Sequence, residues 1–253
     1  PLIEAGIPVL IEKPVTADRA SFESLYLAAD LKRAPVMVGY HLRFHPCVRT
    51  LKVWLDAERI GRIQSIEVAV HSFMPAWHDY EKPNAFYAGV KALGGGVVLT
   101  EIHEIDLLCW LFGPATLAGA TGGRLGPYEI DVEDTVAALM TFNLEDRRVP
   151  ATVTLSFVQT PPMRRFAVNG ERGRIVMDLP GLSVRLEGDT RDEFRLPAGF
   201  DRNTVLLDEM REFLDCARTG REPPTSLAAV RDGHFAALAI LDELARAPER
   251  LAS

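Results

Sequence analysis

Cysteine, long apolar runs and excess positive charge are all missing or scarce in this chain of 253 residues. Its three cysteines, Cys47, Cys109 and Cys216, lie far apart without a CxxC pair, which favours a reducing cytosol over a disulfide framework. The longest candidate for a membrane span, IDLLCWLF, is short and is interrupted by Asp106. The N-terminus lacks a basic leader followed by a cleavage site. Together these absences predict a cytoplasmic protein that is not inserted in a membrane.

The charge balance is acidic, with 28 Lys and Arg against 35 Asp and Glu, a formal net charge of -7. This balance argues against nucleic acid or an anionic membrane as the main partner. It excludes neither a local basic patch nor a negatively charged substrate. Hydrophobic residues make up 47% of the chain, which is enough for one or two domains with a sizeable core.

The segment VLIEKPVTAD, residues 9–18, raises the first functional question. Residues 9–11 form a short apolar run typical of a buried parallel strand, and Lys13 and Pro14 end it. Thr16 is expected to cap a helix of about residues 17–33, which leads to a second apolar strand at 36–38. Ligands bind at the carboxyl ends of such strands, so Lys13 lies where chemistry tends to occur. Taken alone, a solvated loop lysine is the commoner explanation.

The middle of the chain alternates between helical and extended patterns. Pro46 opens a predicted helix that Gly61 ends, and a half-buried strand follows around 66–70. Residues 74–93 are rich in aromatics and proline and predict a long loop. The glycine run that starts at Gly94 opens a further predicted helix, closed by Gly113.

The remainder is rich in predicted strands. Alternating apolar residues predict strands at 136–142 and 151–157, and GATGGRLG, residues 119–126, is interpreted as a loop. Asn169 and Gly170 are expected in a hairpin turn, and a second hairpin is expected around 187–189. Two helices are predicted to close the chain, the last with an apolar stripe that includes His234.

These patterns predict an α/β remnant followed by an α+β domain with a large, mostly antiparallel open sheet, covered by helices on one face. Residues 1–39 are expected to form the α/β remnant, and residues 40–225 the α+β domain. Residues 226–253 would form a helix that packs back on the junction. Because the chain starts with Pro1 in the middle of a βα pattern, we expect that an earlier portion precedes it.

The segment GGGVVLTEIHEID, residues 94–106, is the strongest candidate for chemistry. Glycines allow close approach of a ligand, and the following helix would turn its amides towards it. His103 and Asp106 are three residues apart and share a helix face, so the carboxylate could orient a histidine acid/base. A hydrogen-bonded core histidine is the equally weighted alternative.

A metal site is the other option, and we do not expect one. His41 and His45 are four residues apart, and His71, His78 and His103 are available. Pro46 and the extended pattern before it argue against a helical HxxxH pair.

Four segments in order, EAGIPVLIEKPVT, GYHLRFHP, GRIQSIEV and LGGGVVLTEIHEIDLLCWLFG, resemble the glucose–fructose oxidoreductase / inositol dehydrogenase / rhizopine catabolism family (Gfo/Idh/MocA). The resemblance spans essentially the whole chain. It implies an NAD- or NADP-binding Rossmann domain, a C-terminal domain with an open sheet, and hydride transfer between nicotinamide and a secondary alcohol of a sugar, nucleotide sugar or inositol. It also implies a homodimer or homotetramer formed through the open sheet face.

The resemblance also implies roles for single residues. Lys13 matches the lysine that hydrogen-bonds the reacting hydroxyl, His103 matches the acid/base histidine, and Glu12 and Pro14 shape the turn on the cofactor side. The candidates for holding the substrate are Arg43, Trp77, Tyr80, Lys82, Tyr87, Thr100 and Asp106.

Two departures from the family pattern keep an alternative open. The usual aspartate one turn before the histidine is replaced by Thr100 or Leu99, and Glu101 would point to another face of an ideal helix. The glycine-rich fingerprint that holds a pyrophosphate is also missing from this sequence. The alternative is a non-catalytic ligand-binding or regulatory relative, and a purely structural sheet domain is a weaker third. We expect the 253 residues alone to bind nicotinamide poorly and to be inactive.

Overall fold

The computed structural model describes residues 1–77 and 80–251, with side chains described as far as Arg246. The chain begins with a small parallel unit made of β1 (Val9–Ile11), α1 (Arg19–Lys32) and β2 (Val36–Val38). β1 and β2 pair in parallel, with Val9 opposite Val36. The predicted strand–helix–strand unit is therefore present, and Lys13 follows the carboxyl end of its first strand, β1.

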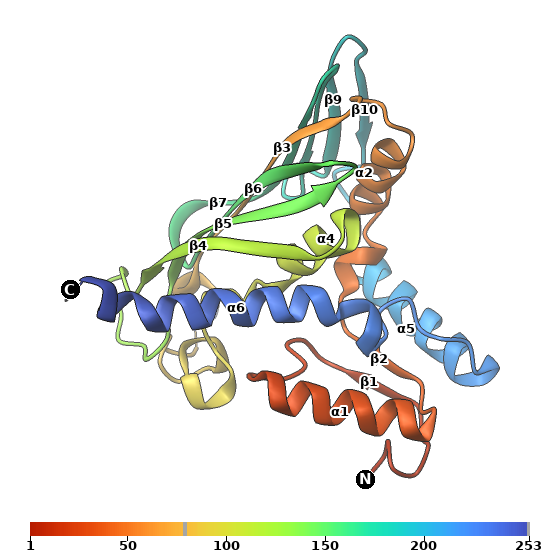
Figure 1. Cartoon of the computed structure of the whole chain (residues 1–253), viewed down its shortest axis with the longest axis vertical. Coiled ribbons are helices and arrows are strands. Elements are labelled where there is room, and N and C mark those ends of the chain that lie inside the picture. The colour runs from red at the N-terminus through yellow and green to blue at the C-terminus, as the bar shows by residue number, and fades with distance from the viewer. Residues whose placement is uncertain (78–79, 252–253) are drawn as a thin grey trace.

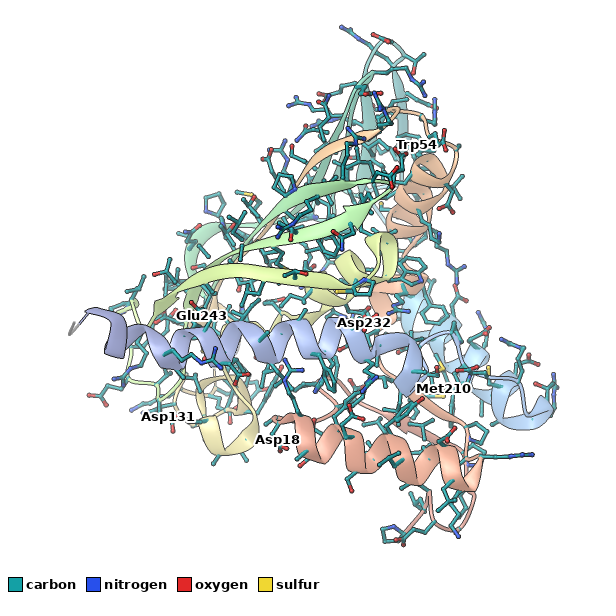
Figure 2. The ribbon with its side chains drawn as sticks, viewed as in Figure 1. Asp18, Trp54, Asp131, Met210, Asp232 and Glu243 are labelled. Atoms are coloured by element: carbon teal, nitrogen blue, oxygen red, sulfur yellow. The ribbon has the colours of Figure 1, made fainter. Side chains whose placement is uncertain are left out.

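The helix of this unit begins later than the sequence predicts. Asp18, labelled at the start of α1 in Figure 2, is the N-cap, and its Oδ1 accepts a hydrogen bond of 2.8 Å from the amide of Ser21. Thr16 was expected to cap the helix, but its hydroxyl instead donates to the Asp18 carbonyl at 2.8 Å. A carboxylate at the N-cap satisfies a helix amide that would otherwise lack a partner.

The large sheet has the order β10-β9-β8-β7-β3-β6-β5-β4. Its pairs are antiparallel except for β3 with β6, which are parallel. The prediction of a large, mostly antiparallel open sheet is confirmed. The strands are β3 (Ile63–Phe73), β4 (Ala115–Gly123), β5 (Thr135–Leu144), β6 (Arg147–Ser156), β7 (Val158–Gly170), β8 (Gly173–Asp178), β9 (Ser183–Gly188) and β10 (Asp192–Arg195).

Helices cover one face of this sheet, as Figure 1 shows. Helix α2 (Pro46–Asp56) contacts β8 and β9, and α4 (Ile102–Phe112) contacts β4 and β5. Helix α6 (Leu227–Leu251) contacts β4. The predicted alternation is confirmed, since Val136, Met140 and Val153 on the covered face are at most 1% exposed. Burial of this apolar face against the helices supplies the main stabilisation of the domain.

The opposite face is exposed and less apolar than the sequence suggests. Alternate residues of the central strands point to it, among them Glu67, Thr152 and Leu139, the last 44% exposed. A charged residue and a threonine next to one exposed leucine do not form a continuous apolar patch.

Three local predictions are wrong. Gly170 pairs with Gly173, so the hairpin turn consists of residues 171–172 rather than Asn169 and Gly170. Residues 119–123, interpreted as part of a loop, lie in the edge strand β4, so these glycines take part in the sheet. Helix α2 ends at Asp56, five residues before Gly61, because the chain already turns at 57–60.

The remaining helices join the two units. α5 (Asn203–Thr219) contacts the short 3-10 turn His41–Phe44, and α6 contacts α1, β2 and α4. In Figure 1, α6 runs between the large sheet and α1. Met210, labelled in Figure 2, belongs to an apolar row of α5 that stays exposed. In the described ranges, no helix is both long and apolar enough to cross a membrane.

Candidate functional site

The side chain of Lys13 extends from the carboxyl end of β1 to the residues around Thr100. Its ammonium donates a hydrogen bond of 2.6 Å to the carbonyl of Thr100, the last residue of the short helix α3 (Val97–Thr100). Burial lowers the pKa of Lys13, and the negative charge of Glu101 opposes that shift. The lysine is thus a half-buried, directed donor, and the solvated-loop alternative does not describe it.

His103 lies on the first turn of α4, next to this contact, and is 4% exposed. Its ring centroid is 4.5 Å from that of His41, and its buried Nδ1 has no hydrogen-bond partner among the described residues. Burial lowers the pKa of His103 well below its usual value, and the charge of Lys13 lowers it further. The side chain is therefore a neutral imidazole at physiological pH, able to accept a proton.

The glycine run before α3 has a different role from the expected one. A Cβ on Gly96 would lie 2.3 Å from a carboxylate oxygen of Glu133, and one on Gly95 would lie 2.4 Å from the Tyr87 carbonyl. The amide of Val98 donates to Glu133 at 3.1 Å. The expectation that glycines and helix amides face a ligand is wrong, because protein atoms occupy that space.

Arg164 on β7 links two carboxylates at the junction of α3 and α4. It forms an ion pair with Glu101 and another with Glu104, in which Nε and Oε1 are 2.8 Å apart. Burial raises the pKa of Glu104 to about 7, while Arg164 acts in the opposite direction. Because α3 ends at Thr100 and α4 begins at Ile102, the interrupted helix lets Glu101 point towards Arg164.

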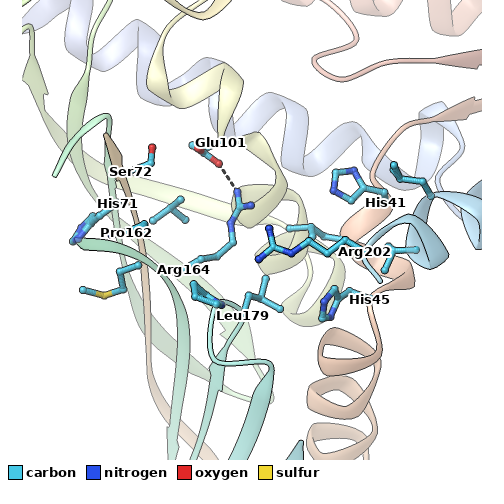
Figure 3. Close-up of a pocket in the computed structure, with 15 residues that line it drawn as sticks. His41, His45, His71, Ser72, Glu101, Pro162, Arg164, Leu179 and Arg202 are labelled. Carbon is cyan, nitrogen blue, oxygen red and sulfur yellow. Dashed lines mark hydrogen bonds and ion pairs between the residues drawn. The ribbon is translucent and has the colours of Figure 1, made fainter. Parts of the chain in front are cut away.

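This group adjoins a cleft of about 480 Å³, a volume within the usual range for small-ligand sites. Figure 3 shows side chains converging on it from the 3-10 turn, β3, β7 and the start of α5. The lining residues are His41, Leu42, His45, Val70, His71, Ser72, Glu101, Pro162, Met163, Arg164, Leu179, Pro180, Arg202, Val205 and Leu206. Glu101 and His41 connect the cleft to Lys13 and His103.

Arg43 and Asp106, two predicted substrate ligands, bind each other instead. Arg43 donates to Asp106 through Nε at 2.8 Å and through Nη2 at 2.6 Å, and it also donates to the carbonyls of Pro224 and Ala229. The exposed fractions are 6% for Arg43 and 1% for Asp106. The expectation that Asp106 orients His103 is therefore wrong, because both of its oxygens accept from Arg43.

The predicted sugar-binding residues of the 74–93 segment do not line the cleft. Trp77 packs edge-to-face on Phe157, with ring centroids 5.0 Å apart, and Lys82 is exposed. Tyr80 is 84% exposed and Tyr87 is 43% exposed. The pKa of Tyr87 is raised by burial and by the charge of Glu101, so Tyr87 is the member of this set that lies nearest the candidate site.

Within the described residues, no group of three or more His, Cys, Asp or Glu side chains is arranged to hold a metal ion. His41 and His45 lie at the start and just after the end of a 3-10 turn rather than on an α-helix, and the His45 ring accepts from the amide of Cys47 at 3.2 Å. His78 lies outside the described residues.

The turn that contains Glu12, Lys13 and Pro14 lies at the carboxyl end of a strand, where ligands of such sheets usually bind. It follows a strand of a parallel pair, and the half-buried Lys13 donor already points to α3. Glu12 is exposed, and its Oε2 lies 3.1 Å from the point where a Cβ on Gly39 would stand. Pro14 lacks a backbone donor and cannot extend the ladder beyond the strand end.

The sequence interpretation missed Arg164, Arg202, Glu104 and the neutral His41 as parts of this site. Arg164 and Arg202 carry no motif, and only the pairing of β7 with β3 and the position of α5 bring them to the cleft. Glu101 lies next to the position where the family usually has an aspartate, which is a signal in the sequence. An ideal helix would have put Glu101 on a different face from His103.

A strand-end lysine thus lies beside a buried histidine, at the junction of a parallel α/β unit and an α+β domain with an open sheet. The model of the GFO/IDH/MocA C-terminal domain matches residues 48–176, about half of the chain. The chain belongs to the Gfo/Idh/MocA family.

Similar proteins include dehydrogenases of polyols. A myo-inositol dehydrogenase, Hyg17, of Streptomyces leeuwenhoekii is 28% identical over 243 residues, covering 93% of this chain and 70% of the relative. The dehydrogenase aclE of Aspergillus oryzae is 26% identical over 203 residues, covering 72% of this chain and 53% of the relative. The chain thus spans between about half and about 70% of the length of these relatives.

The fold agrees with solved structures of sugar dehydrogenases. A levoglucosan dehydrogenase in complex with NADH and levoglucosan superposes with a TM-score of 0.82 at 20% identity, covering 96% of this chain and 73% of the other. A UDP-N-acetylglucosamine 3-dehydrogenase from Acidithiobacillus ferrooxidans superposes with a TM-score of 0.74 at 23% identity, covering 96% and 72%. At these identities the likeness establishes the fold.

Proposed function

We propose that the protein transfers a hydride between NAD or NADP and a secondary alcohol of a sugar, nucleotide sugar or inositol. The observation that carries this proposal is the contact of 2.6 Å between Lys13 and the Thr100 carbonyl, which directs the ammonium towards the helix pair that holds His103. Bound nicotinamide supplies the hydride acceptor, and Glu12, Lys13 and Pro14 are the residues that would hold its reactive end.

In this proposal, Lys13 and His103 have different roles towards the substrate alcohol. Lys13 donates a hydrogen bond to the hydroxyl and stabilises the negative charge that develops on its oxygen. His103, neutral because of its burial, accepts the hydroxyl proton. Thr100 contributes through its carbonyl, which accepts from Lys13, since a threonine hydroxyl does not ionise at neutral pH and so cannot serve as the base.

The domain roles follow from the same proposal. Residues 1–39 would belong to the dinucleotide-binding unit, 40–225 to the substrate-binding and oligomerisation unit, and α6 would secure the junction. We expect the uncovered sheet face to bind a second subunit, giving a homodimer or homotetramer. Light scattering that shows only monomer across micromolar concentrations would contradict the assembly without affecting the chemistry.

The test of the chemistry is Lys13→Met in the native protein, assayed with NAD and NADP against a panel of sugars and inositols. We expect turnover to fall by roughly 100-fold or more, as for loss of an oxyanion or acid/base partner. Lys52→Met is a matched control, because Lys52 forms an exposed ion pair on α2.

A native protein that turns over no member of the panel would favour the second candidate, a non-catalytic ligand-binding relative. The presence of Thr100 where the family usually has an aspartate is the observation that keeps this candidate. Near-normal turnover in Lys13→Met would contradict the assignment of Lys13 directly.

A further inference from the structure

The cleft differs in charge from the rest of the protein. The chain carries a formal net charge of -7, yet the charged residues that line the cleft are Arg164, Arg202 and a single carboxylate, Glu101. Glu101 is paired with Arg164, so its charge is already balanced. The lining therefore has an excess of one positive charge, that of Arg202.

We infer that the cleft binds an anionic group of the substrate, so that the compound oxidised or reduced is a sugar or polyol carrying a carboxylate or a phosphate ester. The inference rests on the proposed function for its reaction and on the cleft for its substrate class. Guanidinium groups suit both anions, because they offer parallel N–H donors to planar carboxylate or phosphate oxygens.

Arg202 is the main cation available to such a group. Its carbonyl accepts from the amide of Val205, but its guanidinium has no hydrogen bond or ion pair among the described residues, although it lines the cleft. Figure 3 shows its side chain extending from the start of α5 towards Arg164. The neighbouring carboxylate, Asp201, accepts from the amide of Asn203 at 2.9 Å at the start of α5 rather than from Arg202. Two guanidinium groups that face one hollow repel each other unless an anion lies between them.

The neutral polar groups of the cleft favour the same ligand. Burial lowers the pKa of His41 and of His45 to about 4, so both rings are neutral and each can offer an N–H at physiological pH. The charge of Arg202 contributes to the shift of His45, which places these two residues in the same part of the cleft. Each neutral ring can also accept one hydrogen bond, so these groups can bind the hydroxyls of the sugar while Arg202 meets its anionic group.

The geometry also orders the substrate. The His41 ring lies 4.5 Å from the His103 ring, so His41 marks the reacting end of the cleft. Arg202 and His45 lie on the same side of the cleft as His41, and His71 and Ser72 lie across from them, as Figure 3 shows. The anionic group would therefore bind close to the reacting carbinol, and about 480 Å³ accommodates a single sugar ring.

Isothermal titration calorimetry on the 253-residue chain tests the inference with three probes: D-glucuronate, D-glucose 6-phosphate and D-glucose. We expect at least one anionic probe to bind 10-fold or more tightly than D-glucose, and Arg202→Gln to remove that difference. Arg191→Gln is the matched control, since Arg191 is exposed in the turn between β9 and β10. The two anionic probes distinguish a carboxylate from a phosphate ligand.

Equal binding of the neutral and anionic probes, or an anion preference that survives Arg202→Gln, would overturn the inference. A turnover assay of the native protein with the same compounds separates it from the proposed function. Oxidation of neutral sugars alone would refute the anion site and keep the reaction. Anion binding lost in Arg202→Gln, with no turnover of any compound, would keep the site and refute the reaction.

Discussion

The arginine–carboxylate clusters of Arg43 and Arg164 contain the same chemical groups and differ in what surrounds them. Arg43 uses Nε, Nη1 and Nη2 on the Asp106 carboxylate and two carbonyls, and only 6% of it is exposed. Arg164 also binds carboxylates, yet 27% of its side chain is exposed and it lines the cleft. An arginine whose three nitrogens are all hydrogen-bonded away from solvent stabilises the fold, whereas one that is partly exposed can bind a ligand.

The largest expected effect concerns the closed cluster. Arg43→Met should lower the free energy of unfolding by about 3–5 kcal/mol, because it leaves the Asp106 carboxylate buried without a partner. Urea denaturation followed by circular dichroism measures this loss. Arg202→Gln is the control, since Arg202 has no ion pair to lose. Equal stabilities for the two variants would remove the distinction between closed and open arginines.

The buried carboxyl of Glu209 sharpens the comparison because it pairs with no arginine among the described residues. Glu209 on α5 is 6% exposed, its Oε1 lacks a hydrogen-bond partner among the described residues, and burial raises its pKa to about 7. Its ordinary pKa is lower, so the folded state holds the proton more tightly. Stability is therefore lost as the pH rises from about 4.5 to 7.

The Glu209→Gln side chain stays neutral at every pH, so this variant should not lose stability as the pH rises. We expect it to stabilise the protein by roughly 1–3 kcal/mol at pH 8 and by little at pH 4. Urea titrations at both pH values measure the difference. A gain of the same size at the two pH values would mean that the charge of Glu209 is not the cause.

The smallest expected effect tests the open cluster through activity. Glu101→Gln removes the charge that supports the Lys13 ammonium, so the pKa of Lys13 should fall further. We expect kcat/KM to drop by roughly 10-fold and its dependence on lysine protonation to move to lower pH. Glu187→Gln, which breaks an exposed ion pair with Arg174, is the matched control. A pH profile identical to that of the unchanged protein would contradict this link.

Local patterns predicted what depends on neighbours in the chain. The alternation of Val136 and Met140 fixed the buried face of a strand, and the position of Lys13 after an apolar run placed it at a strand end. The partners of charged residues depend on chain segments far apart in sequence. Arg43 pairs with Asp106 across 63 positions, and Arg164 pairs with Glu101 across the same number. Neither pairing leaves a local signal, so the sequence assigned Arg43 to the substrate and overlooked Arg164.

The single parallel pair in the large sheet has a consequence for how the chain folds. β6 and β7 are consecutive in sequence, yet β3 lies between them, and Ile66 is opposite both Ala151 and Val168. Strand β3 leaves the ribosome about 80 residues before either neighbour and cannot form its central pairing until both exist. Closing such long loops is slow because the entropy of closure precedes any gain from contact. The rate at which the sheet closes around β3 should therefore limit how soon the cleft, which Val70 and Ser72 of that strand help to line, becomes competent to bind.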